Sequence, residues 1–80
     1  MTDADILSRF TRILRDLLGD ESIVLRRETV RSEVPGWDSF AYINFIAMVE
    51  AELGIKFRIA DVEAFENVGD IVANAKTLLK

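Results

Sequence analysis

The side chains that could do chemistry in this sequence are few, and one serine stands out among them. The 80 residues contain no histidine and no cysteine. They therefore cannot form a Ser-His-Asp triad, a thiol nucleophile, a Cys/His zinc site or a disulfide framework. The hydroxyl of Ser39 has only the adjacent Asp38 as a base. Ser39 is therefore poorly suited to be a catalytic nucleophile and better suited to be a substrate, and we predict that the protein is not an enzyme and has no catalytic residue of its own.

The charged residues favour neither a metal site nor a nucleic-acid site. The net charge of −4, from 14 acidic and 10 basic residues, has the wrong sign for a chain that neutralises nucleic-acid phosphates. Four acids in the C-terminal part lack the spacing and the glycine of an EF-hand, and ordinary surface acids explain them. These acids are Asp61, Glu63, Glu66 and Asp70. We expect no metal and no nucleic-acid partner.

Helices must position these side chains, because apolar residues recur every three or four positions over residues 3–18, 39–53 and 67–79. A weaker pattern over residues 60–65 predicts one or two further turns. Polar caps and glycine stops fit these boundaries, at Thr2, Asp38, Asn67, Gly19 and Gly54. We predict an all-α fold with one domain over residues 1–80: a small four-helix bundle of three main helices and one short helix.

A long loop over residues 19–37 joins the first two predicted helices. It holds one short apolar segment, residues 23–25, and it ends at Pro35-Gly36. A loop of this length in a compact domain usually has a function or indicates a missed element. Its arginines alternate with acids, which predicts a solvated loop rather than a phosphate site. The residues concerned are Arg26, Arg27 and Arg31, with Glu28 and Glu33.

The second predicted helix is apolar on two sides. We expect its core-facing side to consist of Tyr42, Ile43, Phe45, Ile46, Val49 and Leu53. The uncharged strip across from it consists of Phe40, Asn44, Ala47 and Ala51, with Met48 beside them. An exposed strip of this kind is typical of a docking surface for a partner protein. The alternative is that the long loop buries this side too. Trp37 is likewise either a partner contact or a cover over the core.

Aromatic residues of three helices and of the segment before the short helix are predicted to fill the core. They are Phe10, Phe45, Phe57 and Phe65. The last helix is expected to bury Val68, Ile71, Val72, Ala75, Leu78 and Leu79. A bundle filled in this way leaves little internal space for a long apolar ligand.

Two segments resemble the acyl carrier protein family, and the resemblance extends over the whole chain. The first is Gly36-Trp37-Asp38-Ser39-Phe40 at the start of the second helix, and the second is Glu50-Ala51-Glu52-Leu53-Gly54-Ile55-Lys56-Phe57 at its end. The family pattern is Gly-x-Asp-Ser-Leu, and its serine carries phosphopantetheine as a phosphodiester. The resemblance implies that Ser39 carries this arm and that acyl or aminoacyl groups bind its thiol as thioesters. It also implies that Asp38 helps the transferase and its metal ion to bind.

The partners that this resemblance implies are a phosphopantetheinyl transferase, an acyl- or aminoacyl-activating ligase, and synthase or transferase enzymes. Two departures from the family pattern bear on the pathway. Phe40 replaces the usual leucine, and the second helix lacks the regularly spaced acids of primary fatty-acid carriers, with only Glu50 and Glu52 near its end. Together with Trp37, this resembles a free-standing carrier of a specialised pathway, whether polyketide-like, fatty-acid-like or amino-acid-activating. We expect its partners to dock mainly by apolar contact, and its cargo to be short or polar.

Two other interpretations stay open at this point. One is a carrier of primary fatty-acid synthesis. The other is a small helical interaction module that is not modified, in which Ser39 only helps to begin a helix. The longest stretch without a charge, residues 39–49, is shorter than the about 18–20 residues that a membrane span needs. Asp3 and Asp5 lie where a secretory signal needs basic residues, so we expect a cytoplasmic location. We also expect a monomer.

Overall fold

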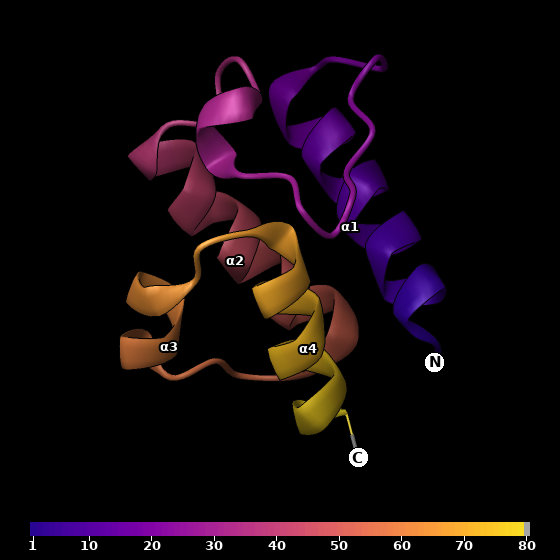
Figure 1. Ribbon diagram of the computed structural model, residues 1–80, viewed down its shortest axis with the longest axis vertical. Helices are drawn as coiled ribbons and strands as arrows, with labels where there is room; N and C mark the ends of the chain where they lie inside the picture. The colour runs from indigo at the N-terminus through magenta and orange to yellow at the C-terminus, as the bar shows by residue number, and fades with distance from the viewer. Residues whose placement is uncertain (80) are drawn as a thin grey trace.

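Four α-helices pack around one apolar core in the computed structural model, which describes residues 1–79 (Figure 1). They are α1 (Asp3–Leu18), α2 (Ser39–Leu53), α3 (Ile59–Ala64) and α4 (Val68–Leu78), and a 3₁₀ turn, η1 (Arg31–Glu33), precedes α2. No strand occurs in residues 1–79. The prediction of an all-α fold with three main helices and one short helix is confirmed.

Side-chain caps begin the three main helices at the predicted residues. The Thr2 hydroxyl accepts from the Asp5 backbone N–H at 3.1 Å, and the Asp5 carboxylate accepts from the Thr2 N–H at 2.9 Å. Asn67 Oδ1 accepts from the Asp70 N–H at 2.9 Å. At the other end of α1, Gly19 has a φ of 64°, a left-handed conformation that glycine adopts without strain. Local sequence therefore determines where these helices start and stop.

The core lies where α1 packs against both α2 and α4. At its centre, the rings of Phe10 and Phe45 meet edge to face with centroids 5.5 Å apart, and both are fully buried. Phe57 is also buried, whereas Phe65 is only half-buried and meets the Phe57 ring at 5.7 Å. Three of the four aromatic predictions are thus fully confirmed, and Phe65 packs at the edge of the core.

Two residues predicted to be in the core are exposed. Ile43 is 58% exposed and Leu78 is 41% exposed, while Ala41, which was not assigned to the core, is 8% exposed. The buried face of α2 is therefore turned toward Ala41 and away from Ile43. Periodicity missed this rotation because α2 is apolar on most sides, so its pattern of apolar residues does not define one inner face.

The long loop returns along α1 before it turns to η1 and α2 (Figure 1). Ile23 and Leu25 insert into the core, and Arg15 Nε donates to the Ile23 carbonyl at 2.7 Å. The loop also contacts the start of α4, where the Gly69 N–H donates to the Arg27 carbonyl at 2.7 Å. A Cβ on Gly69 would lie 3.0 Å from that oxygen, a tight contact that would make the loop shift by a few tenths of an ångström. The loop is a structural part of the domain and contains a turn, η1, that the sequence did not predict.

Candidate functional site

Ser39 is the first residue of α2 and is exposed. Before it, Asp38 caps the helix, because its Oδ1 accepts from the Ala41 N–H at 2.9 Å. The backbone just before the cap is fixed by Gly36, whose φ is 87°, and by the Trp37 N–H, which donates to the Val34 carbonyl at 3.1 Å. The hydroxyl of Ser39 is therefore accessible to solvent on a backbone that is held in place.

Trp37 anchors this segment in the core. Its side chain is 4% exposed, and its ring lies 5.2 Å from the Phe45 ring and 6.2 Å from the Tyr42 ring. A buried indole offers no surface to another protein, so the prediction of a partner contact at Trp37 is wrong and its alternative, a cover over the core, is confirmed. Burial of Trp37 therefore holds the backbone in place two residues before Ser39.

A surface groove of about 340 Å³ opens beside Ser39, between α2, α3 and η1. We call it the Ser39 groove, and its lining consists of Arg31, Ser39, Tyr42, Ile43, Val62, Glu63 and Phe65. One hydrogen bond ties α3 to α2 across it: the Tyr42 hydroxyl donates to the Val62 carbonyl at 2.7 Å. Burial raises the pKa of Tyr42, and the nearby Arg31 opposes that rise, so the phenol stays protonated and keeps donating at neutral pH.

Arg31 is a lining residue that the sequence gave no reason to select. Its guanidinium lies over the Tyr42 ring, with Cζ 5.1 Å from the ring centroid. The prediction for this arginine was a solvated loop position, because it alternates with acids. Arg31 belongs to the loop and Tyr42 to α2, and the Pro35-Gly36 turn separates them in the sequence. A local sequence pattern therefore could not predict that these two residues are in contact.

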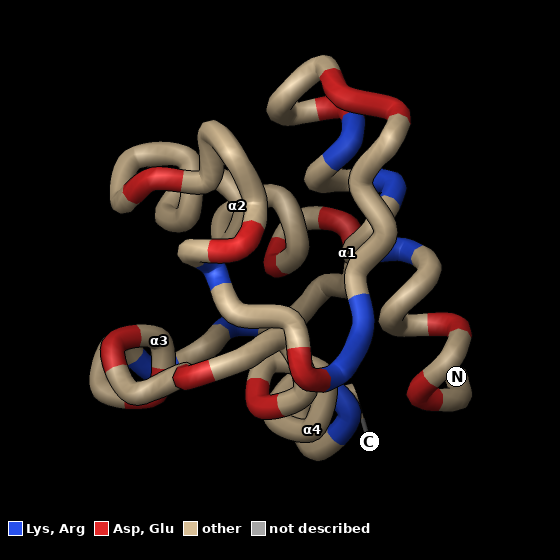
Figure 2. Tube along the Cα trace, turned by 45° about the horizontal axis from the view of Figure 1, so that its top comes forward, with Lys and Arg blue, Asp and Glu red and all other residues tan. Residues whose placement is uncertain are grey.

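The uncharged strip of α2 lies on the surface. Phe40 is 78% exposed and Met48 is 38% exposed, Ala47 and Ala51 are exposed, and Asn44 is half-buried. The alternative that the long loop covers this side of α2 is therefore wrong. In Figure 2 the trace of α2 stays tan over residues 39–49, since no charged residue occurs there. An exposed apolar strip thus begins one residue after Ser39.

Among the residues that the structure describes, no group of three or more acids forms a metal site, and no helix is long and apolar enough to cross a membrane. The structure thus places Ser39 and Asp38 together at one helix start. It adds the Ser39 groove on one side and the uncharged strip on the other.

The fold and the site define a small four-helix domain with an exposed serine at the start of its second helix, and comparison with known proteins specifies the family. No family model matches the sequence. The solution structure of a holo acyl carrier protein from Geobacter metallireducens matches with a TM-score of 0.85 and 35% sequence identity, over 92% of this chain and 85% of that chain. The chain belongs to the acyl carrier protein family, as its sequence pattern predicted.

Proposed function

We propose that this protein carries acyl or aminoacyl groups as thioesters on a phosphopantetheine arm joined to Ser39. The observation that carries the proposal is the exposed Ser39 at the start of α2, in a chain whose fold and sequence match a holo acyl carrier protein. The arm supplies a thiol, which the chain itself lacks. The protein in this proposal is a substrate and carrier, and not an enzyme.

The local structure suits a phosphodiester at Ser39. Free backbone N–H groups and the positive end of the helix dipole at the start of α2 favour an anion there. Asp38 opposes that anion with its own charge, but one of its oxygens is occupied by the Ala41 N–H. We propose that the remaining carboxylate oxygen helps the transferase and its metal ion to bind. The transferase must supply the base for the hydroxyl, because the chain contains no histidine.

Mass spectrometry of the intact protein tests the modification directly. Protein incubated with coenzyme A and a broad-specificity phosphopantetheinyl transferase should gain the mass of one arm. Ser39→Ala should gain none, while Ser32→Ala, which removes an exposed serine from η1, should gain one arm like the wild type. A folded wild-type sample that gains no mass would contradict the proposal and favour the unmodified interaction module.

We propose that the uncharged strip is the surface that docks the enzymes that load and use the arm. Phe40 and Met48 supply exposed apolar area directly beyond Ser39, and the side chains between them are small or neutral. The partner classes are the transferase, an acyl- or aminoacyl-activating ligase, and synthase or transferase enzymes. Ala47→Glu should raise the Michaelis constant for such a partner, whereas Ala73→Glu, at an exposed position on α4, should leave it unchanged.

The composition of this strip supports a specialised pathway over primary fatty-acid synthesis. Without regularly spaced acids, docking by apolar contact depends little on salt. If the affinity for a partner enzyme falls steeply between low and physiological salt, the result would favour a carrier of primary fatty-acid synthesis. The Ser39 groove supports a short cargo, because its volume of about 340 Å³ is near the lower end of the range for small-molecule sites, about 300 Å³. We further propose that residues 1–80 act as one domain, as a cytoplasmic monomer.

A further inference from the structure

Arg31 is a cation in the Ser39 groove, and we propose that it is a positioning residue that binds the phosphodiester formed at Ser39. This inference rests on the proposed modification of Ser39. It assigns a role to a loop side chain that the sequence placed in solvent. Arg31 and Ser39 line the same groove, and the other charged side chain in its lining is Glu63.

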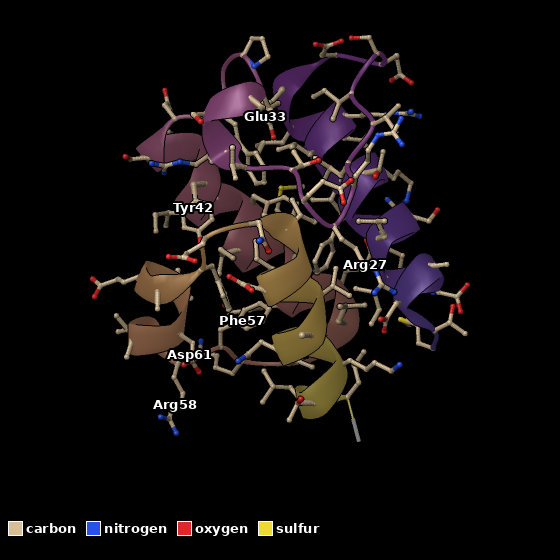
Figure 3. The ribbon with its side chains drawn as sticks, viewed as in Figure 1. Arg27, Glu33, Tyr42, Phe57, Arg58 and Asp61 are labelled. Carbon is tan, nitrogen blue, oxygen red and sulfur yellow. The ribbon has the colours of Figure 1, made fainter. Side chains whose placement is uncertain are left out.

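The position of Arg31 is determined by the turn that carries it. In η1, the Val30 N–H donates to Glu33 Oε1 at 2.8 Å and the Val34 N–H donates to the Arg31 carbonyl at 3.1 Å. The guanidinium then lies over the Tyr42 ring, 5.1 Å from its centroid. Figure 3 shows Tyr42 between the turn that holds Glu33 and the α3 helix that holds Asp61. The cation is thus held above the groove by two elements, η1 and α2.

The guanidinium of Arg31 has unused hydrogen-bonding capacity. Most other arginines are engaged: for example, Arg12 pairs with Glu52, Arg27 pairs with Asp3, and Arg15 donates to the Ile23 carbonyl. The side chain of Arg31 forms neither an ion pair nor a hydrogen bond with any residue within 1–79. Contact with an aromatic ring leaves the N–H groups at the guanidinium edge free to donate, and their geometry matches phosphate oxygens.

A cation beside Ser39 would offset the charges that gather at the modified site. A phosphodiester on Ser39 would add a negative charge next to Asp38 and beside the groove that Glu63 lines. Because opposite charges attract, Arg31, the basic residue in the lining of this groove, would offset part of the negative charge. Its contact would hold the root of the arm on the α3 side of α2. The uncharged strip, which begins at Phe40 on the other side, would then stay free for partner proteins.

The test compares holo proteins by NMR, after intact mass has shown that each carries one arm. The variants are Arg31→Gln, Arg31→Lys and a matched control, Arg26→Gln, which removes an exposed loop arginine that lines a different groove. We expect the ³¹P resonance to shift in Arg31→Gln, to shift less in Arg31→Lys, and to stay in place in Arg26→Gln. In the wild type, the chemical shift of the Arg31 Nε–Hε group should change when the phosphopantetheine arm is attached to the apo protein.

Raising the salt concentration on the holo wild type gives a second measurement that needs no variant. The ³¹P resonance should move toward the position seen in Arg31→Gln, because salt screens an exposed contact. The proposal for Arg31 is overturned if the resonance is the same in wild type and Arg31→Gln, or if Arg26→Gln shifts it equally. A wild type that takes up no arm overturns the modification of Ser39 as well, and intact mass distinguishes this outcome from a failure at Arg31 alone.

Discussion

Replacing Tyr42 with phenylalanine removes one hydroxyl and measures how firmly α3 is held on α2. The hydroxyl donates to the Val62 carbonyl at 2.7 Å, and the half-buried ring stays in place without it. Loss of a hydrogen bond between neutral groups costs about 0.5–1.5 kcal/mol. The edge-to-face pair of Phe57 and Phe65 remains, so α3 should stay docked but open more often. At about 1 kcal/mol, the opening equilibrium of α3 should rise about fivefold.

Native-state amide hydrogen exchange and urea denaturation together test this magnitude. The α3 amides of Val62 and Phe65, which donate to Arg58 and Asp61 carbonyls, should exchange about fivefold faster in Tyr42→Phe. Denaturation can be followed by the fluorescence of the single, buried tryptophan. Thr77→Val, which removes an exposed hydroxyl from α4, is the control and should stay within about 0.5 kcal/mol of wild type. Unchanged exchange in α3 would refute the assigned role of the hydrogen bond.

Three further predictions concern the elements that hold the site. Gly69→Ala should displace the loop at Arg27 by a few tenths of an ångström, because its Cβ would lie 3.0 Å from the Arg27 carbonyl oxygen; unchanged amide chemical shifts around Arg27 would contradict this. Asp38→Ala should cost about 0.5–2 kcal/mol as a lost N-cap, with the loss measured by urea denaturation. Pairing with Lys76 lowers the pKa of Asp3 below its ordinary 3.8, so the stability it contributes is present above pH 3.8 and is lost as pH falls through the lowered pKa. Asp3→Asn should therefore be less stable than wild type near pH 7, and the difference should shrink below pH 3.8; a constant difference would contradict the pairing.

The boundaries of the helices could be predicted from the sequence because short-range contacts determine them. Thr2, Asp38 and Asn67 cap helices through side chains that bond three residues ahead, and such contacts are visible in a local pattern. Ser39 could be selected for a different reason: it lies in a segment that resembles the family pattern, in a sequence without histidine or cysteine. The Ser39 groove could not be predicted, because it depends on where η1 and α3 lie against α2. The contact of Arg31 with Tyr42 is a tertiary contact of this kind.

The α2 helix has apolar side chains in three directions. This explains why it carries few charges, and why the sequence did not correctly predict which of its residues are buried. Phe45 and its neighbours one turn away face α1, Ile43 faces the Ser39 groove, and Phe40 begins the uncharged strip. A helix with one buried face would carry charges on the others, and its apolar pattern would then define the core. In α2 all three directions carry apolar side chains. The spacing of apolar residues therefore could not predict whether Ile43 is buried or exposed.

This division of α2 lets the three roles be tested separately. A charge introduced at the strip, as in Ala47→Glu, should weaken partner binding and leave stability within about 0.5 kcal/mol, because the position is exposed and glutamate is a good helix former. A polar residue at Ile43, which is 58% exposed, should likewise leave the fold intact but change the environment of the arm. Truncation of Phe45, which is fully buried, should cost about 3–5 kcal/mol. Strip variants that unfold the protein as strongly as Phe45→Ala would show that the strip is part of the core and not a free surface.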